Sequence, residues 1–196
     1  MFNKKLLSLG LVAGLLVGTA QVATAADIDV DASIQTQAAL SLTKNTDMDF
    51  GLVEFDALHS GDIQLGTDGT VVLTGATGLT LGAVATTAGD VDVSGDAASV
   101  VEISCETGGS LTDGGANTLT LSDVEIAIDT GAAAGAGTAC AGLTTVSTTV
   151  DLAVTATPKI LMGGTLDVTA DAIDGSFTYD TAAVGGDPVT LRVVYQ

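Results

Sequence analysis

Apolar residues recur at every second position through most of the chain, in short stretches that glycine, aspartate and asparagine interrupt. Successive side chains of a β-strand point to opposite faces, so this spacing predicts strands with one apolar face. Turn residues return about every 8–12 positions, and beyond residue 25 no run of helix-forming residues is long enough for a helix. The spacing therefore predicts an all-β protein.

The composition agrees with this fold class and argues against a disordered chain. Apolar residues make up 46% of the sequence, far above their share in disordered segments. Thr and Val, which favour strands, are abundant, whereas aromatic residues make up 3% and Trp is absent. About ten short strands can be counted, and their spacing predicts one β-sandwich domain of immunoglobulin-like or jelly-roll type.

Several strands and turns can be assigned by residue. Residues 44–47 and 66–69 have the composition of turns, and the second of these predicts a hairpin. A slip in the two-residue spacing between Leu121 and Val124 predicts a β-bulge near Ser122 and Asp123. The other expected strands contain the following residues: Met48 to Phe55, Ile63 and Leu65, Val71 and Leu73, Leu79 and Leu81, Val91 and Val93, Val101 to Cys105, Val150 to Val154, Leu166 and Val168, and Phe177 and Tyr179.

The first 25 residues have the form of a secretory signal peptide. Lys4 and Lys5 supply a positive charge, an apolar run follows at residues 6–17, and Ala-Thr-Ala at residues 23–25 forms a small-residue cleavage site. The apolar run is too short to span a bilayer. We therefore expect a chain that is exported and is then secreted or held at the cell surface.

The exported chain is strongly acidic. The formal net charge is −19, and loss of Lys4 and Lys5 with the signal peptide would change it to −21, because no acidic residue is removed. Such a surface repels nucleic acid and anionic lipid. We therefore expect neither as a partner, and we expect no membrane insertion after cleavage of the signal peptide.

Cys105 and Cys140 are the two cysteines of the chain. An even number of cysteines in an exported protein predicts a disulfide. This bond would close a loop of about 35 residues and contribute roughly 3–4 kcal/mol to stability. Metal ligation and a reactive thiol are the alternatives, but no histidine or second cysteine pair lies near either residue in the sequence.

Catalytic and metal-binding residues are sparse. His59 is the one histidine, and a single loop histidine in a secreted β-rich chain is usually a solvated surface residue. No nucleophile elbow is present, so we expect no enzyme and no cofactor. Asp and Gly cluster at residues 68–69, 90–92, 113–115 and 171–175. Structural calcium stays open as an alternative there, but these are also the ordinary residues of turns, and we expect no metal site.

Both ends of the exported chain carry an alternating apolar stripe. We expect an N-terminal strand segment at residues 26–44 and a β-sandwich domain at residues 45–196. The apolar positions of the first segment are Ile28, Val30, Ala32 and Ile34, which alternate with aspartates and a serine. At the other end, Gly185 and Gly186 precede a terminal strand whose apolar face consists of Val189, Leu191, Val193 and Tyr195.

Two segments resemble a pilin-like domain of unassigned function that occurs in secreted proteins of Gram-negative bacteria. They are Met-Asp-Phe-Gly at residues 48–51 with the strand that begins at Gly69, and residues 160–168 with residues 175–179 and the final valine-rich strand. The ending also resembles that of chaperone–usher fimbrial subunits, which have a glycine about a dozen residues from the end, an alternating strand and a penultimate aromatic residue. This resemblance implies a domain that lacks one strand and receives it from the next subunit.

The leading hypothesis is a non-enzymatic, secreted subunit of a fimbria-like or surface filament that self-associates by donor-strand exchange. The donor face would consist of Ile28, Val30, Ala32 and Ile34, and the terminal strand would border the acceptor groove. A periplasmic chaperone is a candidate partner. In the alternative, the N-terminal strand pairs within its own domain, and the protein is a self-complete surface adhesin or extracellular matrix protein that binds ligands through its loops.

Overall fold

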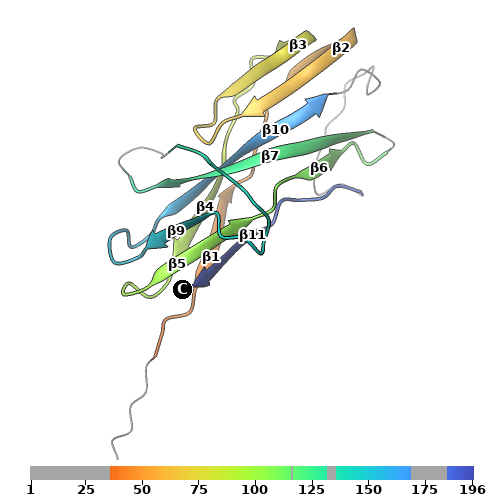
Figure 1. Cartoon of the computed structure of the whole chain (residues 1–196). Coiled ribbons are helices and arrows are strands. Elements are labelled where there is room, and N and C mark those ends of the chain that lie inside the picture. The colour runs from red at the N-terminus through yellow and green to blue at the C-terminus, as the bar shows by residue number, and fades with distance from the viewer. Residues whose placement is uncertain (1–35, 116, 132–135, 169–184) are drawn as a thin grey trace, which may run out of the picture. The chain divides into compact units, whose positions relative to one another are not determined.

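A computed structural model of the chain describes residues 36–115, 117–131, 136–168 and 185–196, and all regular structure in these ranges is β. The described residues form eleven strands in two sheets (Figure 1). In chain order the strands are β1 (Ser41–Thr46), β2 (Val53–Leu65), β3 (Val71–Leu81), β4 (Gly89–Ser94), β5 (Val100–Cys105), β6 (Gly109–Thr112), β7 (Thr118–Asp129), β8 (Thr138–Ala139), β9 (Thr148–Asp151), β10 (Lys159–Val168) and β11 (Leu191–Tyr195).

The larger sheet is built around the antiparallel pair of long strands β7 and β10. On its other side, β10 pairs with β4 through residues 159–162 and with β2 through residues 164–168. The strand β1 adds to β4 and β3 adds to β2. The short strands β6 and β8 add to β7, β6 at residues 118–121 and β8 at residues 125–126. Beyond the end of β10, β2 and β3 continue as a two-stranded ribbon (Figure 1).

Gly163 stands where β10 changes its partner from β4 to β2. A Cβ atom at this position would clash with the backbone around the carbonyl oxygen of Leu65, so the two strands approach each other too closely for a side chain. Opposite this point, β7 contains one extra residue between Ser122 and Glu125, and Asp123 has a φ of +47°. This irregularity confirms the predicted β-bulge.

The second sheet has the strand order β11–β5–β9 and packs in a sandwich-like arrangement against part of the first. The chain crosses from β4 in one sheet to β5 in the other through residues 95–99. The apolar faces of both sheets form one core, whose fully buried residues include Val93, Val101, Ile103, Ile126 and Ile160. The predicted all-β sandwich with one disulfide is therefore confirmed.

The predicted hairpin at residues 66–69 is also confirmed. The Gly69 N–H donates to the Gly66 carbonyl oxygen at 2.9 Å, and Gly69 has a φ of +80°, which favours glycine. The side chain of Asp68 accepts a hydrogen bond from the Thr70 N–H at 2.9 Å, and this bond is the main cause that lowers the pKa of Asp68.

Some predicted strand limits were wrong. Val71–Leu81 is one strand and not two, because Gly75 and Gly78 adopt positive φ and the ladder with β2 shifts its register without ending. In the same way, β2 joins the end of the strand expected at Met48 to Phe55 with the separate strand expected at Ile63 and Leu65. The strand expected to reach Val154 ends at Asp151, and Val154 is 82% exposed in the turn that follows. The pair Phe177 and Tyr179 lies outside the described residues.

The start of the sandwich also differs in detail from the sequence analysis. Residues 44–46, which we expected in a turn, belong to β1, and β1 pairs with β4 from Ser41 onward. The expected limit between the N-terminal segment and the sandwich, at residue 45, therefore falls inside a paired strand. The sheet irregularity between Lys44 and Thr46 explains why the local composition resembles a turn.

We predict that Gly163→Ala destabilises the domain by about 1–3 kcal/mol, since its methyl group meets backbone atoms that cannot move aside. Gly164→Ala is the matched control. It adds the same methyl group one residue further along β10, where the nearest neighbour is the end of the flexible Leu121 side chain at 3.0 Å. Urea denaturation measures both variants, and equal midpoints for the two would contradict the assignment of Gly163 as the point of closest approach.

Candidate functional site: the edge bordered by β1 and β11

The last residues of the chain run along β5 as an edge strand. Gly185 has a φ of +94°, and Asp187 then forms a two-way backbone bridge with Ser110. From Leu191, opposite Cys105, to Tyr195, opposite Val101, β11 pairs with β5 in a regular antiparallel ladder. Among the residues that the structure describes, β11 has β5 as its one strand partner.

The hydrogen bonds of this ladder show which backbone groups of β11 point away from β5. The Glu106 N–H donates to the Thr190 carbonyl oxygen, and the Gln196 N–H donates to the Val100 carbonyl oxygen. Thr190 and Gln196, which flank β11, both have even numbers, and the direction of the backbone groups alternates from residue to residue along an antiparallel strand. The N–H and C=O groups of Leu191, Val193 and Tyr195 therefore point to the outer edge of the sheet.

The side chains of the same three residues point inward. Leu191, Val193 and Tyr195 pack against the core, as does Val189 just before the strand, whereas Arg192 is exposed on the outer face. These inward side chains are only partly buried. Their neighbours Val101, Ile103 and Cys105 on β5 are 0% exposed. The apolar face of β11 is therefore incompletely covered.

The first strand shows the same incomplete cover on the opposite sheet. Leu42 lies directly opposite Val93 of β4, so the two side chains share one face. Val93 is 0% exposed, and this face therefore points into the sandwich, yet Leu42 is 41% exposed. An inward-facing leucine that keeps this exposure marks a place where the sandwich is not closed.

The strands β1 and β11 border the same side of the sandwich (Figure 1). The Tyr195 hydroxyl donates to the carbonyl oxygen of Ala38, just before β1, at 2.8 Å and accepts from the Asp96 N–H at 2.7 Å. In the same region, the side-chain amide of Gln37 donates a hydrogen bond to the Ser99 hydroxyl. We call this place the β1–β11 edge and define it by Leu42 on β1 and Leu191, Val193 and Tyr195 on β11.

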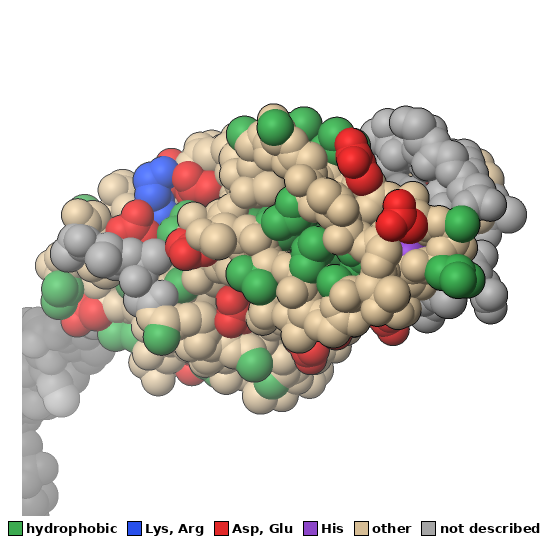
Figure 2. All heavy atoms as spheres, turned by 90° about the horizontal axis from the view of Figure 1, so that it is seen from above, with side chains coloured by type: hydrophobic (Ala, Val, Ile, Leu, Met, Phe, Trp, Pro, Cys, Tyr) green, Lys and Arg blue, Asp and Glu red, His purple; other side chains and the backbone are tan. Residues whose placement is uncertain are grey.

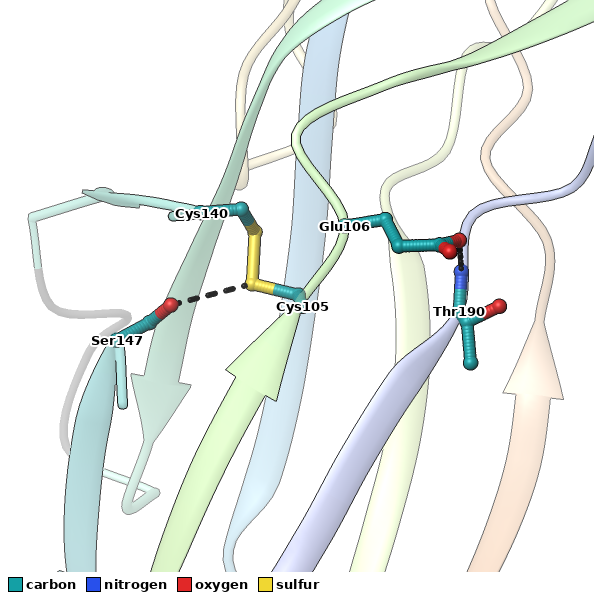
Figure 3. The surroundings of a disulfide bond; sticks show 5 residues. All are labelled: Cys105, Glu106, Cys140, Ser147 and Thr190. Carbon is teal, nitrogen blue, oxygen red and sulfur yellow. Dashed lines mark hydrogen bonds between the residues drawn. A yellow bond between two sulfur atoms is a disulfide. The ribbon is translucent and has the colours of Figure 1, made fainter. Parts of the chain in front are cut away.

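The Cys105–Cys140 disulfide joins the two sheets (Figure 3). Cys105 ends β5 in the smaller sheet, and Cys140 follows β8 in the larger one. This confirms the predicted disulfide. Next to it, a carboxylate oxygen of Glu106 accepts a hydrogen bond from the Thr190 N–H at 2.8 Å, just before β11. The start of β11 is thus attached close to the covalent link between the sheets.

Acidic side chains (red) are spread over the face shown in Figure 2, and the basic side chain visible there (blue) lies beside acidic ones. Lys159 lies 2.8 Å from Asp90 and 3.7 Å from Asp92, and the hydrogen bond that its ammonium group donates to Asp90 is the main cause that raises the pKa of Lys159. Lys44 pairs with Asp47. Arg192 forms no ion pair with an acidic residue in the described ranges.

The other residues singled out by the sequence have different outcomes. The expected donor positions Ile28, Val30, Ala32 and Ile34 lie outside the described residues, and the role of the terminal strand in assembly stays a prediction. His59 was expected on the surface, which was wrong. It is 4% exposed, its Nδ1 lies 2.8 Å from the Asp56 carbonyl oxygen, and its ring packs edge-on against Phe55. No group of three or more His, Cys, Asp or Glu residues within the described part of the chain could hold a metal ion.

Sequence reasoning missed two residues of this site. Leu42 was not singled out from the sequence, because its exposure depends on which strand lies across from it in space. Glu106 gave no signal at all, because its role comes from the position of Thr190, which is 84 residues away in the sequence.

Comparison with known proteins identifies the family. The model of DUF4402, a domain of unknown function, matches residues 40–184, and the chain belongs to this family. The match includes β1 through β10, whereas β11 follows it. No curated protein and no solved structure shows a significant match. Within the described ranges there is no helix of the length and hydropathy needed to cross a membrane.

Removal of the disulfide by Cys105→Ala with Cys140→Ala should lower the free energy of unfolding by roughly 3–4 kcal/mol, because it frees a loop whose ends are 35 residues apart. Denaturant unfolding measures this loss. Wild-type protein in excess reductant is the control and should show a similar loss. If the double variant were as stable as the oxidised wild type, the disulfide would not brace the two sheets.

The Tyr195 hydroxyl should also contribute to stability. Tyr195→Phe keeps the ring but removes the hydrogen bonds to Ala38 and Asp96, and we expect a loss of about 1 kcal/mol. Amide hydrogen exchange provides the specific readout, since the Asp96 N–H loses its acceptor and should exchange faster. Unchanged exchange at Asp96 would show that this bond does not persist in solution.

Proposed function

We propose that the chain is an exported, non-catalytic subunit of a fimbria-like or surface filament, and that each copy receives a strand from the next copy at its β1–β11 edge. The N-terminal segment of the exported chain supplies this strand, and main-chain hydrogen bonds to β11 hold it in place. In this proposal the function of the protein is mechanical: it links one copy to the next.

The observation that carries this proposal is the exposure of Leu42. Its side chain faces the interior of the sandwich beside the buried Val93, yet 41% of it is accessible to solvent. Across from it, β11 has outward-pointing backbone groups and partly buried apolar side chains. One additional strand beside β11 would satisfy these backbone groups and cover both apolar faces.

The N-terminal segment has the composition that such a strand requires. Ile28, Val30, Ala32 and Ile34 give one apolar face, and the positions between them are polar. Burial of these four side chains contributes roughly 5–8 kcal/mol before the cost of ordering the segment. With its main-chain hydrogen bonds, such a strand would make a durable joint between copies.

The longest edge strand of the described sheets is less suited to strand addition. The edge strand β3 has eleven residues, but Gly75 and Gly78 adopt φ values of +60° and +63° and the ladder with β2 shifts its register there. Such bulges are a common protection against unwanted edge pairing. By contrast, β11 pairs with β5 without a register shift.

The test is a comparison of two variants of the full chain, expressed with its leader in the organism that encodes it so that any dedicated chaperone is present. In one variant Ile28, Val30, Ala32 and Ile34 become serine. In the matched control Asp27 and Asp29 become asparagine, which alters the same segment but keeps its apolar face and leaves Asp31 unchanged. On a denaturing gel without boiling, we expect a ladder of multimers for wild type and control, and monomer for the serine variant.

A single monomer band from the intact protein would overturn the proposal. It would favour a self-complete adhesin or matrix protein, in which the N-terminal segment pairs within its own domain.

A further inference from the structure

We infer that the donor segment seats at the β1–β11 edge in one register, with Asp31 of one copy opposite Arg192 of the next. This inference rests on the proposed function and specifies how the partner copy is recognised. It follows from the lengths of the two apolar stripes and from the position of Arg192, a cation with no acidic partner among the described residues.

The two stripes have the same length. The apolar face of the donor runs from Ile28 to Ile34, and the inward face of the C-terminal segment runs from Val189 to Tyr195. Each has four apolar residues at two-residue spacing. A one-residue slip would turn the donor's apolar face toward solvent, so only slips by two residues compete with full overlap.

Full overlap selects the same central pair for either strand direction. Asp31 is the middle residue of its stripe, and Arg192 is the middle residue of the other. If the strands are antiparallel, Ile34 lies opposite Val189 and Ile28 lies opposite Tyr195. If the strands are parallel, Ile28 lies opposite Val189 and Ile34 lies opposite Tyr195. In both cases Asp31 lies opposite Arg192.

The surroundings of Arg192 favour an acidic partner. Its side chain is exposed on the outer face of β11, and one guanidinium N–H donates to the Leu143 carbonyl oxygen at 3.3 Å. A guanidinium group carries five N–H donors, so others can bind a carboxylate. Of the three basic residues in the described ranges, Lys44 and Lys159 have acidic partners, whereas Arg192 has none among the residues that the structure describes.

Loss of apolar overlap disfavours both competing registers, and the charge of Arg192 disfavours one of them. A slip by two residues places either Asp29 or Ser33 opposite Arg192, and it moves one apolar side chain of the donor past the end of the β11 face. The register that places Ser33 opposite Arg192 also loses the ion pair. The sequence has 24 acidic residues and five basic ones, so the donor's aspartates have few basic partners other than Arg192.

Cysteine cross-linking tests the register in the full chain. In the variant Asp31→Cys with Arg192→Cys, residues that lie directly opposite have Cα atoms about 4.5–5.5 Å apart, which is within the range of a disulfide. After mild oxidation and boiling without reductant, we expect a covalent ladder that reductant removes. The matched controls pair Arg192→Cys with Asp29→Cys or Ser33→Cys. Their cysteines would be about 7–8 Å apart, so the ladder should be lost.

The outcomes separate this inference from the proposed function. If unboiled samples show a ladder but the cysteine at position 31 cross-links no better than one at 29 or 33, the register is wrong and strand exchange stands. If the disulfide forms inside a monomer, the segment occupies its own domain and the inference fails. If the wild type shows no unboiled ladder, the proposed function fails and the inference with it.

Charge reversal gives a second readout without new thiols. Arg192→Glu or Asp31→Arg alone should weaken assembly by about two- to fivefold, the size of an exposed cross-strand ion pair. The two changes in one chain restore the pair with opposite polarity and should recover assembly. Absence of recovery would contradict a direct contact between these residues.

Discussion

The antiparallel pairing of β11 with β5 is the interaction on which the candidate site depends. It determines that the backbone groups of Leu191, Val193 and Tyr195 point to the sheet edge and that their side chains point inward. It is secured at one end by the Glu106 carboxylate, beside the disulfide, and at the other by the Tyr195 hydroxyl. A strand this short would pair poorly with an added strand if its ends frayed, but hydrogen bonds hold both of its ends.

At the β1–β11 edge each sheet ends in an edge strand, β1 in the larger sheet and β11 in the smaller one. The larger sheet is built around the β7–β10 pair, and β10 changes its partner from β4 to β2 at Gly163. The Cys105–Cys140 disulfide joins the two sheets at the end of β5 where β11 begins, because Leu191 lies opposite Cys105. The start of β11 therefore lies beside the covalent link, whereas its end is connected to the residues before β1 by the Tyr195 hydroxyl.

Much of the fold could be predicted because two-residue periodicity and turn chemistry are local properties. The hairpin at residues 66–69, the bulge near Asp123 and the all-β class depend on residues within a few positions of each other. Strand limits were harder, since the glycines of β3 bend a continuing strand and do not end it. The exposure of Leu42 could not be predicted, because it depends on which strands lie around it in space.

The hydrogen bonds of Tyr195 have a consequence for how a joined chain would carry load. A pull on the N-terminal segment enters the domain at Ala38, and the tyrosine hydroxyl passes part of that force directly to the end of β11. A strand added beside β11 would pull on the same element. Tension along a filament would then run through adjacent strands in the direction of their axes, so that several backbone hydrogen bonds resist together and are not peeled apart one by one.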